Sequence, residues 1–187
     1  MSVPRGILGR LCLFILLVIS VPAYGDQRDP RLPKLFDRLS AASNSSEGLL
    51  FAHLIDEVWL ETKNSQIREP LRHALNAMEE EDLALASKLL DQVVKDAPGF
   101  AEGWNKRATV HFLMGDFEAS VADIQQTLAL EPRHFGALIK LGLICVQLNE
   151  PAAALRSFET ALELHPHRRY LKGRVDRLRD QLAAHRI

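Results

Sequence analysis

Four basic residues recur along the chain at one spacing of 34 residues, and basic side chains are the groups with which proteins bind carboxylates. They are Arg38, Arg72, Lys106 and Lys140. Arg68 precedes Arg72 by four residues, so both charges share one face if this segment is helical. This recurrence predicts a row of charges that binds an acidic segment of a partner protein. The alternative interpretation is that these are solvated surface charges.

Motifs for catalysis are missing from the sequence. It contains no phosphate-binding glycine loop, no Gly-x-Ser-x-Gly, no His-Glu-x-x-His and no Cys-x-x-Cys. His165 and His167 flank a proline, and we interpret them as loop residues rather than metal ligands. Cys145 is interpreted as a small buried apolar residue. We therefore predict no catalytic residue, no metal site and no cofactor, and an enzymatic function has no positive support.

Composition restricts the class of protein further. The chain has 187 residues, 47% of them hydrophobic, and a net charge of −1. These values are typical of a globular protein and exclude a disordered chain or a polytopic membrane protein. Near-neutral charge and few aromatic residues argue against nucleic-acid binding.

The first 25 residues have the features of a secretory signal peptide. Arg5 and Arg10 precede nine apolar residues at 11–19, and small residues follow. The alternative, a membrane-spanning helix, needs about 20 apolar residues. We expect cleavage before Asp26, with cleavage after Ala23 as the second choice, and export to the periplasm.

The rest of the chain repeats with a period of 34 residues. Pro98, Pro132 and Pro166 mark this period, and each follows an amphipathic helical segment. Small residues recur at the same interval, at Ala52, Ala86, Ser120 and Ala154. A fixed period in this range predicts a solenoid of stacked helical hairpins.

The repeated segments resemble the tetratricopeptide repeat (TPR) family, most closely at 135–168. That segment has Leu138, Gly142, Ala154, Phe158 and the closing proline at the positions typical of the family. The resemblance predicts an all-α, TPR-type solenoid. Its expected parts are a polar leader at 26–32, a degenerate hairpin at 33–66, repeats at 67–100, 101–134 and 135–168, and a capping helix at 169–187. In the degenerate hairpin, Asp56 occupies a position where a large apolar residue is expected. Trp104 is expected to be buried between repeats.

Resemblance to this family also implies a concave groove lined by the first helix of each repeat. The groove would carry the four recurring cations together with Arg68, Asn105, Leu75 and Leu143. Some TPR proteins clamp a partner's terminal carboxylate there, and Asn105 and Lys106 match that pattern only in part. We therefore expect the groove to combine a basic edge with an apolar floor.

The capping helix permits two interpretations. Its apolar stripe includes Leu171, Val175 and Leu178, and the other faces carry Lys and Arg. It either closes the solenoid or docks the protein on an anionic membrane or a partner helix. The first interpretation predicts a non-enzymatic adaptor of the bacterial cell envelope. The second predicts a membrane-surface accessory subunit of an envelope enzyme or secretion complex.

Overall fold

The structure is a computed structural model that describes residues 27–184, and within this range it contains helices and no strand. The all-α solenoid predicted from the sequence is therefore confirmed. The predicted signal peptide at 1–25 lies outside the described residues. The helices are α1 (Leu32–Ser40), α2 (Ser45–Leu60), α3 (Ser65–Glu79), α4 (Leu83–Asp96), α5 (Ala101–Met114), α6 (Phe117–Leu130), α7 (Phe135–Gln147), α8 (Pro151–Leu164) and α9 (Arg169–Ala184).

Local sequence signals set the turns between paired helices. Gly115 ends α5 in the left-handed conformation, with φ at 80°. Asp116 then caps α6 by accepting a hydrogen bond from the Ala119 amide at 3.0 Å. Asp82 caps α4 in the same way through the Leu85 amide. These caps explain why the α3–α4 and α5–α6 hairpins turn at short polar segments.

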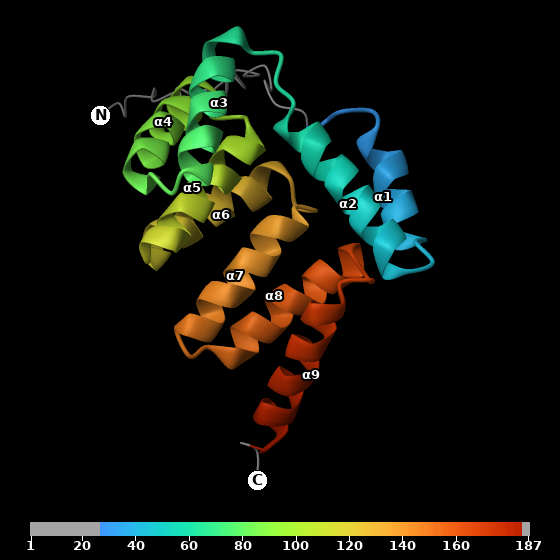
Figure 1. Ribbon diagram of the computed structural model, residues 1–187. Coiled ribbons are helices and arrows are strands. Elements are labelled where there is room, and N and C mark those ends of the chain that lie inside the picture. Colours follow the sequence, from blue (N-terminus) through green and yellow to red (C-terminus); the bar gives the residue numbers. More distant parts are fainter. Residues whose placement is uncertain (1–26, 185–187) are drawn as a thin grey trace, which may run out of the picture.

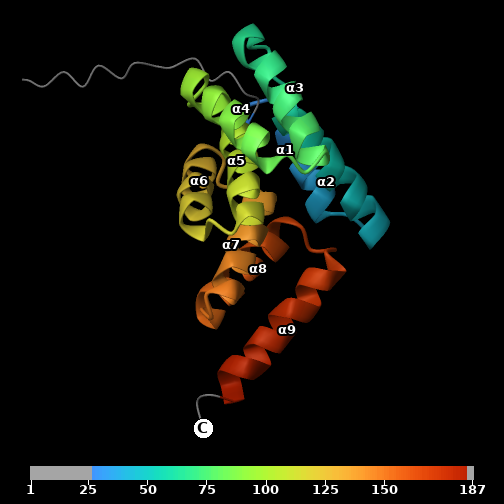
Figure 2. The same ribbon diagram turned by 60° about the vertical axis from the view of Figure 1, so that its left-hand side comes forward.

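Three hairpins, α3–α4, α5–α6 and α7–α8, stack in chain order and end at α9 (Figures 1 and 2). Small residues allow the close approach that this stacking needs. Ala74, Ala86 and Ala108 are fully buried, and Gly142 faces the ring of Phe158. Large side chains fill the remaining space, and each repeat buries an apolar face that it could not bury alone.

Helix α9 packs against α8 through its apolar stripe, which joins the core around Phe158. Arg179 adds an ion pair to Glu159 of α8 at 2.6 Å. This packing supports the interpretation of α9 as a cap. Among residues 27–184, no helix combines the length and apolar character needed to cross a membrane.

The N-terminal hairpin departs from the stacking order. Helix α2 does not pack along α3; instead α1 packs on α8 and α2 approaches α5. The hairpin lies against the three loops that join one repeat to the next, at 97–100, 131–134 and 165–168. We call this row of loops the proline edge, because each loop contains one of the period-marking prolines.

Contacts from the hairpin reach all three loops of the proline edge. Gln27, just before α1, donates a hydrogen bond to the Gly99 carbonyl at 2.8 Å. The Arg133 guanidinium lies 4.3 Å from the centre of the Phe36 ring. Ser45 donates to the carbonyl of His167 at 3.1 Å. The segment 33–66 is thus a helical hairpin that docks sideways on the later repeats.

Burial of Trp104 differs from what the sequence led us to expect. Trp104 is only half-buried: its Nε1 donates to the Pro98 carbonyl and its ring stacks under Arg107. The prediction that Trp104 is buried between repeats is wrong, because neighbouring repeats meet through Phe100 and Val93 instead. Trp59 of α2 is 2% exposed and fills the junction between the hairpin and the proline edge.

Candidate functional site

A pocket of about 370 Å³ lies between the α2–α3 linker and α3. Its apolar part comes from Leu60, Leu71 and Leu75. Three cations lie around them, and Glu61 is the single acidic lining residue. The complete lining is Leu60, Glu61, Thr62, Lys63, Arg68, Leu71, Arg72 and Leu75. We call it the linker pocket; it exists because the hairpin departs from the stack at the linker.

Three of the residues predicted from the sequence to bind a partner meet in the linker pocket, namely Arg68, Arg72 and Leu75. Arg72 is exposed and donates to Glu69 of the same helix at 2.6 Å. This contact leaves the guanidinium at the surface, where solvent screens it and a stronger anionic ligand can replace it. The pocket therefore combines apolar contact area with a positive rim.

Asn105, Lys106 and Lys140 form a second group, deeper between α5 and α7. The Lys140 Nζ donates to the Asn105 carbonyl and side-chain oxygens at 3.1 Å, and also to Thr109. Lys106 lies 3.0 Å from Glu102, four residues earlier on α5. Lys140 thus joins α7 to α5, and Lys106 is paired within α5, so neither offers a free charge.

Burial and neighbouring charges shift the acid–base behaviour of this second group. Burial opposes ionisation of Glu102, but Lys106 and His134 outweigh it and hold the pKa of Glu102 at about 2. Burial lowers the pKa of Lys140 to about 8, and the nearby charge of Lys106 acts in the same direction. The Asp56 side chain on α2 is exposed on one side, but its carboxyl group is partly shielded from water by the surrounding protein. This partial desolvation, together with the negative charge of Glu102, raises the pKa of Asp56 to about 6.

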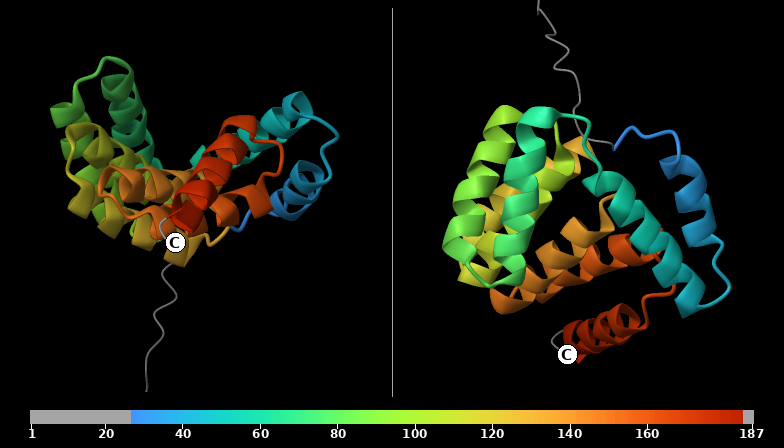
Figure 3. Two further views of the ribbon diagram at one scale, coloured as in Figure 1. Left: turned by 90° about the horizontal axis from the view of Figure 1, so that it is seen from below. Right: turned by 45° about the horizontal axis from the view of Figure 1, so that its top comes forward.

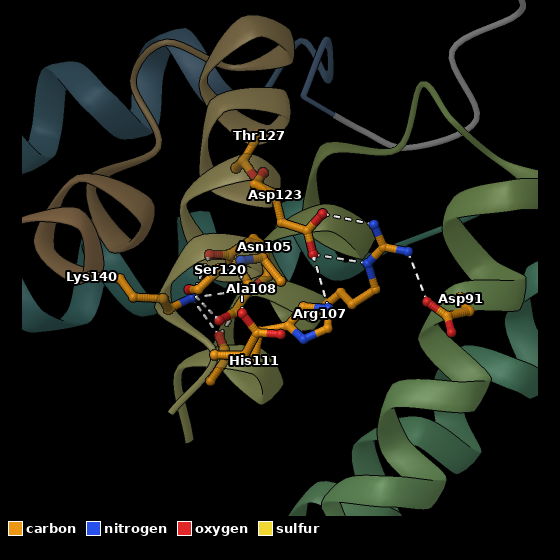
Figure 4. A network of polar contacts seen from close by, with 12 residues as sticks. Asp91, Asn105, Arg107, Ala108, His111, Ser120, Asp123, Thr127 and Lys140 are labelled. Carbon is orange, nitrogen blue, oxygen red and sulfur yellow. Dashed lines mark hydrogen bonds and ion pairs between the residues drawn. The ribbon is translucent and has the colours of Figure 1, made fainter. Parts of the chain in front are cut away.

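A neighbouring polar network holds α4, α5 and α6 together (Figure 4). Arg107 donates to both carboxylate oxygens of Asp123, at 2.8 and 2.7 Å, and to Asp91 at 2.8 Å. Ser120 of α6 donates to the Ala108 carbonyl of α5 at 2.7 Å. Since all of its members pair internally, this network has a structural role in stacking the repeats.

The remaining predicted residues lie away from both groups. Arg38 is on α1, where its guanidinium lies 5.0 Å from the centre of the Phe51 ring, outside the linker pocket. Leu143 is half-buried and packs against the core of the last repeat. The predicted row of four cations is therefore broken at its first member, because the α1–α2 hairpin does not continue the stack.

Sequence reasoning missed the side chains at the junction of hairpin and solenoid. Trp59 stacks on His134, with ring centres 4.1 Å apart and an angle of 16° between the planes. His134 in turn contacts Glu102 at 2.8 Å. One signal in the sequence was Asp56, which broke the repeat pattern; it faces the charges of this cluster rather than an apolar core.

His165, also at this junction, is fully buried with neither ring nitrogen hydrogen-bonded. Its ring meets Phe135 edge-on, at 5.8 Å between centres. Burial, helped by the positive charge of Arg168, lowers the pKa of His165 from 6.5 to about 4. The imidazole is thus held neutral in an apolar site.

This burial leads to a pH prediction. As the pH falls below 6.5, His165 becomes protonated in the unfolded chain, whereas in the folded protein it stays neutral until about pH 4. His165 therefore makes the free energy of unfolding fall as the pH drops through this interval. We expect His165→Leu to remove this slope and to raise stability, because it removes two unpartnered polar atoms. Urea titrations across the interval measure both effects.

Asp56 acts in the opposite sense over part of the same range, because its raised pKa lets the folded state bind a proton first. Its contribution cancels when wild type and variant are compared at each pH. His73→Gln, at an exposed histidine, is the matched control. An unchanged pH slope in His165→Leu would show that this histidine is solvated.

Comparison with known proteins agrees with this architecture. The TPR family profile matches residues 106–169. A TPR repeat-containing protein of Rhizobium etli is 32% identical over 156 residues, covering 83% of this chain and 76% of the relative. The chain therefore belongs to the tetratricopeptide repeat family.

Solved structures show the same fold. The TPR2B domain of yeast Sti1, in a complex with an Hsp70 peptide, is similar with a TM-score of 0.59 at 19% identity. The match covers 63% of this chain and 99% of that domain. The first TPR domain of Spaghetti (RPAP3), bound to the HSP90 peptide SRMEEVD, gives a TM-score of 0.60 at 17% identity, over 63% of this chain and 94% of that domain. Proteins of this family and fold are typically protein-interaction modules.

Proposed function

We propose that the protein is a non-enzymatic adaptor that binds an acidic, partly apolar peptide segment of a partner protein in the linker pocket. The observation that carries this proposal is the lining of that pocket: three leucines, with Lys63, Arg68 and Arg72 outnumbering Glu61. Leucine side chains supply desolvation energy, and exposed cations steer an acidic segment and select for it.

The similarity to Spaghetti (RPAP3) supports this choice of partner chemistry, since the peptide bound there contains three acidic residues. We further propose that the protein works in the bacterial cell envelope after export. Support for this location comes from the sequence pattern of residues 1–25.

We expect the double variant Arg68→Glu/Arg72→Glu to bind acidic peptides about tenfold more weakly than wild type. Each exposed charge contact contributes about 0.2–1 kcal/mol, and reversal replaces attraction with repulsion at two sites. Fluorescence anisotropy measures binding of labelled SRMEEVD and of a library of short peptides that combine acidic and apolar residues.

Lys88→Glu/Lys95→Glu is the matched control, because it reverses two exposed cations on α4 of the same repeat, outside the linker pocket. Both double variants should unfold at nearly the wild-type temperature. Equal binding by the two variants at low salt would place peptide recognition elsewhere.

A further inference from the structure

A second groove lies on the hairpin itself, between α1 and α2, with a volume of about 570 Å³. Its floor is apolar, and charged side chains stand along both walls. The lining residues are Pro30, Arg31, Lys34, Leu35, Arg38, Phe51, Leu54, Glu57, Val58 and Glu61. The two helices form one end of the molecule, beyond which no other described helix lies (Figures 1 and 3). We call this surface the hairpin groove.

The hairpin groove is an apolar surface without a partner within the described part of the chain. Leu35, Phe51 and Leu54 are only partly buried, and Leu50, one turn before Leu54 on α2, is 53% exposed. In a continuous solenoid the neighbouring repeat covers such a face. Here α3 does not, because the linker directs it away from α2. Adjacent exposed apolar side chains of this kind mark interaction sites.

Charge is distributed unequally between the two walls. The α1 wall carries Arg31, Lys34 and Arg38, whereas Glu57 and Glu61 stand on the α2 wall. Lys34 has no ion-pair partner among residues 27–184, and Glu57, 57% exposed, pairs only with His53 of its own helix. The groove therefore has a positive side and a negative side, and Lys34 and Glu57 are available for ion pairs with a partner.

Two contacts across the groove fix which residues lie opposite each other. Arg31 donates to Glu61 at 3.1 Å near one end, and Arg38 lies over the Phe51 ring near the other. Since α1 and α2 run antiparallel, Lys34 falls at the level of Glu57. The positive and negative sides thus match in height along the groove.

We propose that the hairpin groove is a homodimer interface whose occupant is the same groove of a second copy of this chain. A two-fold axis parallel to the helices places α1 of each copy against α2 of the other, so that four helices form a bundle. Lys34 then faces Glu57 of the partner subunit, and the symmetry makes this pair twice. The apolar floors close on each other between the two pairs.

The self-complementary charge pattern is the reason for choosing a second copy. A uniformly acidic helix would meet Glu57 and Glu61 on the negative wall, and a basic helix would meet the three cations on the other. A second copy of the chain, related by a two-fold axis, places its negative wall against the positive wall of the first copy and its positive wall against the negative wall. This surface is distinct from the linker pocket, so the inference does not depend on the proposed peptide binding.

Charge reversal tests the proposal. Sedimentation equilibrium measures self-association of the protein purified after expression of the full-length chain. Wild type should show a reversible monomer–dimer equilibrium. Lys34→Glu and Glu57→Lys should each weaken self-association about tenfold or more, because each creates two like-charge contacts. An equimolar mixture of the two variants should associate like wild type, since both contacts across the axis are then attractive.

Two further variants complete the test. Leu54→Asp should abolish association by placing a charge in the apolar floor, and Lys172→Glu on α9 should leave it unchanged. Circular dichroism confirms that each variant is folded. The proposal is overturned if wild type is monomeric at all concentrations, if Lys34→Glu and Glu57→Lys associate like wild type, or if their mixture does not recover.

Discussion

Replacement of Trp59 by alanine is expected to detach the α1–α2 hairpin from the solenoid, at a cost of about 3–5 kcal/mol in the free energy of unfolding. Trp59 packs between three rings: Phe36 of its own hairpin, His134 of the proline edge and Phe135 at the start of α7, at 5.9, 4.1 and 5.2 Å between centres. Much of the hairpin core closes around this side chain. Its loss leaves a cavity at the junction, which the rigid stack of repeats cannot close.

Hydrogen exchange distinguishes detachment of the hairpin from general loss of stability. Amides of α1 and α2 should lose protection in Trp59→Ala, while those of α5 to α8 keep most of theirs. Urea unfolding should then separate into two transitions, because the hairpin and the stack no longer unfold together.

Trp104→Ala is the matched control, since it removes the same side chain from a half-buried site. We expect a cost of about 1 kcal/mol, from the lost hydrogen bond to Pro98 and the stacking on Arg107. Equal effects of the two tryptophan substitutions would contradict the docking of the hairpin on the proline edge.

The three stacked repeats could be predicted from the sequence because local signals and packing agree there. Pro98, Pro132 and Pro166 mark the loops, and Gly115 and Asp116 end one helix and begin the next. Small residues such as Ala86 and Ala154, both fully buried, recur at the period of the repeat. Each of these residues shapes one hairpin or the contact between neighbouring hairpins. The same residue types therefore recur with the repeat period and can be recognised in the sequence.

Docking of the first hairpin could not be predicted in the same way. Its contacts join residues far apart in sequence, as between Ser45 and His167 or Gln27 and Gly99. A repeat period records which residues occupy equivalent positions, but it does not record whether a hairpin joins the stack. Asp56 was one departure from the pattern, and the structure explains it by the charged cluster that it faces.

The same cause limits prediction of the candidate site. Arg68, Arg72 and Leu75 belong to one helix, so their common face follows from helical spacing. Arg38 holds the equivalent position in the period but lies in a different groove, because its hairpin is displaced. Lys106 and Lys140 are basic at the predicted positions, yet Glu102, Asn105 and Thr109 occupy their donors. Partner residues of this kind come from side-chain packing, which spacing alone does not define.

The second large effect is expected from a methyl group added to Gly142, where α7 meets α8. A Cβ atom at this position would lie 2.3 Å from Cε1 and 2.5 Å from Cδ1 of Phe158. Phe158 is fully buried among the core of the last repeat, so its ring has no free space to enter. Alanine is a better helix former than glycine by about 1 kcal/mol, but overpacking of a rigid core costs about 1–3 kcal/mol or more. We expect Gly142→Ala to lower the free energy of unfolding by about 2 kcal/mol, as measured by urea titration.

Gly173→Ala makes the same change on α9, where the new Cβ meets only the flexible end of Arg177 at 3.6 Å. It should stabilise the protein by about 0.5–1 kcal/mol, because only the helix propensity changes. Phe158→Leu tests the origin of the Gly142 effect, since the smaller side chain makes room for the added methyl group. The double variant Gly142→Ala/Phe158→Leu should be more stable than the sum of the single effects by about 1 kcal/mol or more. Strict additivity of the two substitutions would show that the close approach of α7 and α8 at Gly142 does not limit the packing of this repeat.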